Sequence, residues 1–256
     1  MSDAGADRDA ARHMNRDPRP TMSPADADPD QHEPMRLVLV RHPEVAIAPG
    51  ICYGRSDISL KAPPTTGADR IAARVAALCA ITGTRARSVR LYASPLVRCA
   101  DVASALAAQW GGPLAIDSDL AELDFGRWEL RPWDSIDRDA LDAWAADLEH
   151  GRPHGGESVA MVGQRVERWL ARASAQGAGT LVAITHAGVM RVAAARLLGE
   201  PIAESLRRPL EFEGVCCFAR RTPSDRADGA ANVGDWALTH WNGEDVGAPA
   251  GGERDG

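Results

Sequence analysis

The stretch LVLVRHPEV, residues 37–45, decides the fold because four consecutive apolar residues end directly in Arg41 and His42. A short apolar run bounded by polar residues is typical of a strand that is buried on both faces of a parallel sheet. In an open α/β sheet, ligands bind outside the carboxyl ends of the strands. The charged and titratable residues at the end of this strand are therefore candidates for a functional site.

Two further segments repeat this pattern. Val89–Ala93 (VRLYA) and Leu181–Ile184 (LVAI) are short and apolar, and polar residues follow each of them at once. Helical patterns alternate with these strands, at about residues 66–80, 96–108, 135–148, 159–175 and 189–198. Residues 211–218 and 235–241 are predicted to close the sheet as a pair of strands. The alternation predicts an α/β protein, a three-layer α/β/α sandwich with a mostly parallel central sheet.

The composition limits the classes of function. The 256 residues, 45% apolar and 25% charged, suit one soluble domain with a sizeable core. The net charge of −7 predicts no bulk attraction to nucleic acid or to an anionic membrane. With no long apolar run and no secretory h-region, the chain is expected to be cytoplasmic. The five cysteines show no CxxC pair and are expected to be reduced thiols. The oligomeric state cannot be read from these features.

Both ends of the chain differ from its middle. Residues 1–34 contain no Val, Ile, Leu or aromatic residue, and they carry eight acidic against four basic side chains. Such a segment cannot bury enough apolar area to offset the entropy of ordering, so it is predicted to be a disordered acidic tail. Residues 35–241 are predicted to form the single domain. Residues 242–256, which are rich in glycine and acidic residues, are predicted to be a flexible tail.

The other two strands also end in polar side chains. THAGV, residues 185–189, places His186 after one strand, and SPLVR, residues 94–98, places Ser94 and Arg98 after the other. Ser94 is the predicted N-cap of the helix that follows, with Arg98 in its first turn. With the end of the first strand, the edge would gather two histidines, two arginines and two helix N-termini, which together suit a phosphoryl group. A metal site is disfavoured, because no HxxxH spacing or carboxylate cluster accompanies these histidines.

Five segments then resemble the histidine phosphatase superfamily, in its order and approximate spacing. They are RHP (41–43), SPLVR (94–98), ELDFGRWE (122–129), GGES (155–158) and THAGV (185–189). The resemblance implies a phosphoglycerate mutase-like fold. Within the superfamily, VRHPEVAIAPGICYGRSDISL, residues 40–60, looks most like the α-ribazole phosphatase branch. Pro43 and Val45 depart from the commoner glycine and threonine, which puts substrate contacts in doubt more than chemistry.

The resemblance implies a role for each residue at the phosphoryl end. His42 would be the nucleophile that forms a phosphohistidine, which water then hydrolyses. Arg41, Arg98 and His186 would bind the phosphoryl oxygens, with His186 counted as catalytic. Glu122 would be the general acid for the leaving alkoxide. No metal or organic cofactor is implied.

Several neighbouring residues carry open alternatives. Asp124 is the rival general acid. Arg55 is predicted to contact the phosphate or the substrate, against the alternative of a surface salt bridge with Asp57. Arg131 and Trp133 would either line the substrate entrance or belong to a capping loop without direct contact. The GGES segment is predicted to lead into the next helix, with its glutamate in a structural role.

The expected function is therefore a phosphomonoesterase acting on a small-molecule phosphate ester. The branch resemblance implies hydrolysis of α-ribazole 5′-phosphate to α-ribazole and phosphate in the nucleotide-loop stage of cobalamin biosynthesis. Three alternatives stay open. They are a broad-specificity small-molecule phosphatase, a mutase-type phosphotransferase, and a phospho-ligand-binding module that has lost catalysis. Neither nucleic acid nor membrane is an expected partner.

Overall fold

A computed structural model describes residues 35–79, 81, 89–177, 179–221 and 235–246 of the chain. All of these residues belong to one compact unit, residues 33–256. The predicted acidic tail, residues 1–34, lies outside the described residues. Among the helices that the structure describes, none combines the length and the apolar character that crossing a membrane requires.

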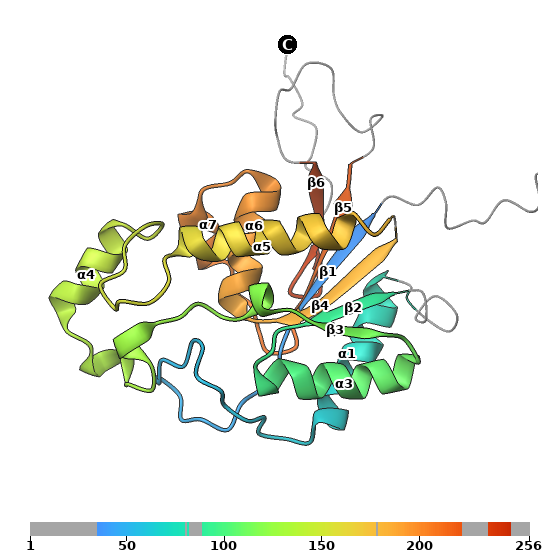
Figure 1. Cartoon of the computed structure of the whole chain (residues 1–256), viewed down its shortest axis with the longest axis horizontal. Coiled ribbons are helices and arrows are strands. Elements are labelled where there is room, and N and C mark those ends of the chain that lie inside the picture. Colours follow the sequence, from blue (N-terminus) through green and yellow to red (C-terminus); the bar gives the residue numbers. More distant parts are fainter. Residues whose placement is uncertain (1–34, 80, 82–88, 178, 222–234, 247–256) are drawn as a thin grey trace, which may run out of the picture. The chain divides into compact units, whose positions relative to one another are not determined.

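The described strands form one sheet in the order β3-β2-β4-β1-β5-β6-β7 (Figure 1). The strands are β1 (Arg36–Arg41), β2 (Arg90–Ala93), β3 (Leu114–Ile116), β4 (Thr180–Thr185), β5 (Val215–Arg220), β6 (Trp236–Trp241) and β7 (Glu244–Asp245). The first four in this spatial order run parallel, and β5, β6 and β7 continue the sheet in antiparallel pairs. The mostly parallel centre thus places the carboxyl ends of β1, β2 and β4 at one edge.

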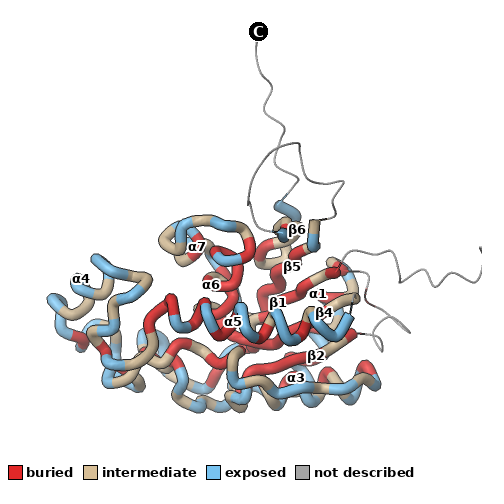
Figure 2. The backbone as a smooth tube through the Cα atoms, turned by 45° about the horizontal axis from the view of Figure 1, so that its top comes forward, coloured by how far each residue is buried: buried red, intermediate tan, exposed pale blue. Residues whose placement is uncertain are grey.

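Helices cover both faces of this sheet, as the sequence predicted. On one face, Val38 and Val40 of β1 pack in a core with α1 (Pro64–Cys79) and α3 (Val97–Trp110). On the other face, Leu37 and Leu39 share a core with three helices, and Figure 2 shows the buried strands between these layers. Those helices are α5 (Val159–Ser174), α6 (Ala187–Leu198) and α7 (Ile202–Arg207). The side chains of β1 thus alternate between two cores, which is why its apolar run is unbroken.

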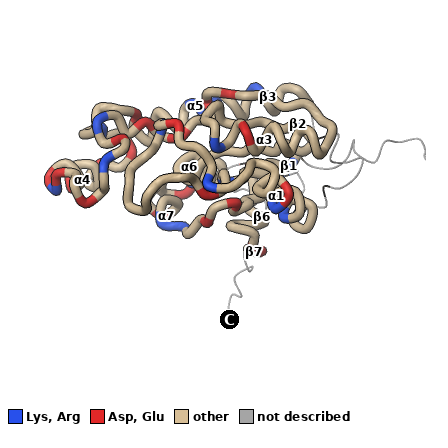
Figure 3. The backbone as a smooth tube through the Cα atoms, turned by 90° about the horizontal axis from the view of Figure 1, so that it is seen from below, with Lys and Arg blue, Asp and Glu red and all other residues tan. Residues whose placement is uncertain are grey.

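A small third cluster lies apart from the sheet. It is built around Cys52, Trp128 and Ile136, and it packs against α4 (Arg138–Ala146). In Figure 1, α4 stands away from the sheet, and Figure 3 shows charges of both signs along it. The connection to α4 contains short 3-10 helices at residues 118–120, 126–128 and 133–135. This cluster is rich in aromatic residues and borders the site described below.

The end of the sheet differs from the sequence prediction. The predicted domain boundary at residue 241 falls short of β7, which pairs with β6. Asn242 and Gly243 connect the two strands with φ of 55° and 88°. Positive φ at two consecutive residues is the requirement of a type I′ hairpin turn, and Asn-Gly is its preferred pair. The dipeptide therefore continues the sheet at a point where composition alone predicted a tail.

Candidate active site

His42 follows β1 and is buried, with 2% of its surface exposed. Its backbone N–H donates to the carbonyl of Thr185, the last residue of β4, at 3.0 Å. Its ring Nδ1 lies 2.7 Å from the carbonyl oxygen of Pro43. A carbonyl oxygen only accepts, so this bond places the ring proton on Nδ1 and leaves a lone pair on Nε2. Pro43 gives up a backbone N–H, but the group used here is its carbonyl, which proline keeps.

The site contains a pocket of about 120 Å³. Its lining includes Arg41, His42 and Glu122, and also the aromatic side chains of Tyr53, Phe125 and Trp133. One set of groups suits an anion and an acid–base reaction, and the other suits a flat apolar group. Trp133, for which the sequence allowed either an entrance position or a capping loop without contact, lies in the pocket wall. Arg131 is exposed and donates to the carbonyl of Ser135 at 2.7 Å.

Arg41 supplies a positive charge to this pocket. Its Nη1 donates to the carbonyl of Leu210 at 2.7 Å, and its guanidinium lies 4.0 Å from the centre of the Phe212 ring. Its Nε is buried and has no hydrogen-bond partner among the described residues. An unpaired buried donor costs about 1–3 kcal/mol, and more when it is charged. An anion in the pocket would satisfy this donor.

His186 is fully buried beside His42, with the two ring centres 5.2 Å apart. Its Nδ1 accepts from Nε of Arg98 at 3.2 Å, and its Nε2 lies 2.8 Å from the hydroxyl of Ser94. Because arginine only donates, His186 carries its proton on Nε2 and donates it to Ser94. The predicted meeting of His42, His186 and Arg98 at one sheet edge is therefore observed.

The helix that follows β2 begins later than predicted, so Ser94 is not its N-cap, although its hydroxyl does accept from a backbone N–H. The N-cap of α3 is Leu96, which makes no capping bond with its side chain, and the N–H of Val97 instead donates to Oδ1 of Asp57 at 2.7 Å. The Ser94 hydroxyl accepts from the backbone N–H of Leu96 at 3.3 Å and from Nε2 of His186 at 2.8 Å. The helix end is thus satisfied by a carboxylate from a distant loop, which local sequence patterns do not reveal.

Arg98 is fully buried and donates hydrogen bonds to the loop that contains Asp57. Its Nη1 donates to the carbonyl of Ser56 at 2.8 Å, and its Nη2 donates to the carbonyl of Gly54 at 2.6 Å. These contacts are made to backbone groups, and Arg98 is not among the residues that line the pocket. Its predicted contact with a phosphoryl group stays a prediction.

The loop of residues 54–56 is held from its other side by Glu129, for which the sequence predicted no role. Oε1 accepts from the backbone N–H groups of Arg55 at 2.8 Å and Phe125 at 3.0 Å, and Oε2 accepts from that of Ser56 at 2.9 Å. A Cβ at Gly54 would collide with the carbonyl oxygen of Leu123. The Arg55 side chain is exposed and does not line the pocket, so its predicted phosphate or substrate contact stays a prediction.

Glu122 faces the same pocket as His42. Its carboxylate accepts from the N–H of Leu123 at 3.0 Å and from that of Gly188, in the first turn of α6, at 3.1 Å. A Cβ at Gly188 would collide with this carboxylate. The rival acid, Asp124, accepts from the N–H of Gly126 at 2.7 Å and is not part of the pocket lining. Glu122 therefore shares the pocket with His42, whereas Asp124 does not.

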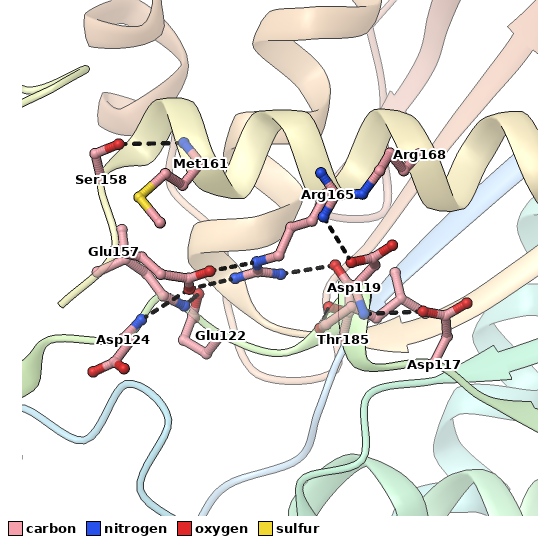
Figure 4. Close-up of polar contacts among 12 residues, drawn as sticks. Asp117, Asp119, Glu122, Asp124, Glu157, Ser158, Met161, Arg165, Arg168 and Thr185 are labelled. Carbon is pink, nitrogen blue, oxygen red and sulfur yellow. Dashed lines mark hydrogen bonds and ion pairs between the residues drawn. The ribbon is translucent and has the colours of Figure 1, made fainter.

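A buried ion pair supports the Glu122–Asp124 segment (Figure 4). Arg165 of α5 binds Glu157 through Nε and Nη2, both at 3.1 Å, and its Nη1 donates to the carbonyl of Asp119 at 2.7 Å. Glu157 also accepts from the backbone N–H of Asp124 at 3.2 Å. Ser158, the N-cap of α5, accepts from the N–H of Met161 at 3.3 Å. The GGES segment thus starts the helix as predicted, and its glutamate has a structural role.

The electrostatic setting keeps both histidines neutral. Burial and the nearby charge of Arg98 lower the pKa of His42 well below its usual value, and Arg41 adds to this effect. Burial, Arg98 and His42 likewise lower the pKa of His186. A neutral imidazole is the form that attacks an electrophile. Within the described residues, no three His, Cys, Asp or Glu side chains converge in a group that could hold a metal ion.

Comparison with known proteins agrees with this geometry. The family model of the histidine phosphatase superfamily (branch 1) matches residues 37–227, and the chain belongs to this superfamily. It is a phosphatase of the phosphoglycerate mutase-like fold.

Among curated proteins, the chain is 30% identical to the adenosylcobalamin/alpha-ribazole phosphatase of Salmonella typhimurium over 174 residues, 66% of this chain and 82% of that protein. It is 37% identical to the Escherichia coli protein of the same name over 93 residues, so the match spans 46% of that relative. It is also 29% identical to the glucosyl-3-phosphoglycerate phosphatase of Mycolicibacterium vanbaalenii, over 81% of this chain and 94% of that protein. The alpha-ribazole phosphatase structure from Shigella flexneri aligns with a TM-score of 0.64 at 26% identity, over 84% of this chain and 99% of that one.

Replacing Arg165 with leucine should destabilise the fold. Arg165 is buried and Glu157 is largely shielded from solvent, with side-chain exposures of 7% and 14%, so the substitution leaves a mostly buried carboxylate without its ion-pair partner. The expected loss in the free energy of unfolding is about 3–5 kcal/mol. Arg168→Leu is the matched control, because Arg168 pairs with Asp119 at 59% exposure and should lose less than about 1 kcal/mol. Denaturant unfolding measures both, and equal losses would contradict a special role for the buried pair.

Acidification should destabilise the protein through the two buried histidines. The folded state holds them neutral, whereas the unfolded chain protonates them below a pKa of about 6.5. No cost arises above that pH, and each histidine then costs about 1.4 kcal/mol per pH unit until its lower folded-state pKa is reached. Urea unfolding at pH 7.5 and 5.5 should show this loss. His186→Gln should make the loss smaller, and an unchanged loss would rule out its contribution.

Proposed function

We propose that the chain hydrolyses a phosphate monoester through a phosphohistidine at His42. The observation that carries this proposal is the Nδ1 contact with the Pro43 carbonyl, which leaves Nε2 of a buried, neutral imidazole as the nucleophilic atom. The imidazole shares its pocket with a cation and a carboxylate, Arg41 and Glu122. Membership of a phosphatase superfamily supports the same chemistry.

In the proposed first step, Nε2 of His42 attacks phosphorus, and the bond from phosphorus to the ester oxygen breaks. Glu122 donates a proton to the leaving alkoxide. Arg41 faces the phosphoryl oxygens, where its unpaired Nε donates, while Arg98 and His186 complete the positive and hydrogen-bonding environment. In the second step Glu122 takes a proton from water, the water oxygen attacks phosphorus, and the bond to His42 breaks. Phosphate leaves and His42 is neutral again.

For the substrate, we propose α-ribazole 5′-phosphate. Tyr53, Phe125 and Trp133 provide aromatic surfaces in the pocket, and aromatic rings favour a flat base. A glycerate carboxylate would need a further cation. Among the described residues that line the pocket, the arginine is Arg41, and in this proposal the phosphoryl group already engages it. The similarity to alpha-ribazole phosphatases supports this choice. The reaction would then belong to cobalamin nucleotide-loop assembly in the cytoplasm, with a small-molecule ester as the partner.

Substrate preference is measured as phosphate release from three esters at equal concentration. We expect kcat/KM for α-ribazole 5′-phosphate to exceed that for glucosyl-3-phosphoglycerate and for phenyl phosphate by about tenfold. A favourable aromatic stacking contact contributes up to about 1.5 kcal/mol, which corresponds to about tenfold in rate. His42→Ala should abolish release from all three. The reverse order of the first two esters would overturn the substrate proposal and keep the mechanism. Transfer of phosphate between substrates without net release would replace hydrolysis with a mutase reaction.

Replacing Glu122 with glutamine should remove the general acid. We expect kcat to fall by about 10² to 10⁴, because the leaving alkoxide loses its proton donor. Asp124→Asn serves as the control, since Asp124 lies outside the pocket lining, and should retain kcat within about tenfold. An aryl phosphate with a very acidic leaving group should be much less affected by Glu122→Gln. If Asp124→Asn caused the larger loss, the two roles would be exchanged.

A further inference from the structure

A pair of thiols lies away from the phosphatase pocket. Cys79, the last residue of α1, and Cys217 of β5 have their sulfur atoms 3.0 Å apart. Cys217 is paired with Val38 of β1, so the thiols adjoin the strand that leads to His42 but not the histidine itself. Both thiols are free. The proposed phosphatase mechanism uses neither of them.

This pair is more accessible than the other cysteines. Cys79 and Cys217 are each 6% exposed, whereas Cys52, Cys99 and Cys216 are exposed by 1% or less. Both members of the pair line a second cavity of about 250 Å³. A small reagent that enters this cavity therefore meets both sulfur atoms.

The surroundings of the two sulfurs differ, because Nη1 of Arg36 donates to the backbone carbonyl of Cys79 at 3.3 Å and so places a positive charge beside that residue. The hydrogen bond from Cys217 and the positive charge of Arg36 lower the pKa of Cys79. The same contact raises the pKa of Cys217. Burial raises the pKa of Cys52 and of Cys216 to about 12. The thiolate is the reactive form of cysteine, so Cys79 is the nucleophile of the pair and Cys217 is its partner.

We propose that Cys79 and Cys217 form a dithiol site that hydrogen peroxide converts into a reversible intramolecular disulfide. The Cys79 thiolate attacks one peroxide oxygen, the O–O bond breaks, and the departing hydroxide takes up a proton to become water, which leaves a sulfenic acid on Cys79. The Cys217 sulfur then attacks the Cys79 sulfur, the S–O bond breaks, and hydroxide leaves with the proton of Cys217 as a second water. Two electrons pass from the sulfurs to the peroxide.

The disulfide would join the end of α1 to β5, across 138 residues of sequence. A crosslink that closes so long a loop restricts the unfolded chain strongly. We expect the oxidised protein to melt at a temperature higher by on the order of 5 °C. A thiol reductant should reverse this shift.

The test uses the full chain under native conditions. The reduced protein is treated with hydrogen peroxide, its remaining thiols are alkylated after unfolding, and its peptides are mapped by mass spectrometry. A peptide that joins Cys79 to Cys217, lighter by two hydrogen atoms than its reduced parts, is the expected product. Free thiols at both positions after treatment, or a crosslink between other cysteines, would overturn the proposal.

Three variants test the division of roles. With Cys217→Ser, dimedone should trap a sulfenic acid on Cys79, because the partner sulfur is absent. With Cys79→Ser, no adduct should form on Cys217. The matched control is Cys216→Ser, which removes the adjacent, fully buried thiol and should still give the disulfide. An adduct on Cys217 in the Cys79→Ser protein would contradict Cys79 as the nucleophile.

Discussion

The site depends on one buried guanidinium. Arg98 has no exposed surface, and a charge removed from water is tolerated only when its donors are satisfied. Its donors bind the carbonyl oxygens of Gly54 and Ser56 and the ring of His186. One side chain therefore fixes a loop, a helix start and the tautomer of a histidine. The neighbouring His42 is kept neutral by the same charge and by its burial.

The fold and the centre of the site could be predicted from the sequence because they depend on local patterns. Apolar runs identified β1, β2 and β4, and helical periodicity identified most of the covering helices. The rule that strand ends gather at one edge then brought His42, His186 and Arg98 together. These inferences need no knowledge of loop paths, since the sheet alone sets the positions of its strand ends.

The parts that could not be predicted depend on partners distant in sequence. Ser94 matched a cap pattern, but its hydroxyl is shared between the N–H of Leu96 and the ring of His186, and Asp57 accepts from the first N–H of the later helix start. Glu129 was passed over because its partners are backbone groups of a loop whose path the sequence does not reveal. Trp133 reaches the pocket through the same loop packing. The strand β7 did have a local signal, because the Asn-Gly pair is typical of a hairpin turn. The glycine-rich and acidic composition of residues 242–256 instead favoured a flexible tail.

The loop around residue 56 and the start of α3 are joined by hydrogen bonds in both directions. Asp57 caps the helix, and Arg98, from the first turn of that helix, binds the loop carbonyls. These reciprocal contacts tie one wall of the pocket to one helical turn, so we expect the two segments to open together as one unit of local unfolding. Amide protons in both segments should then exchange with solvent in the same opening event, so fraying of the first turn of α3 would also loosen the pocket wall.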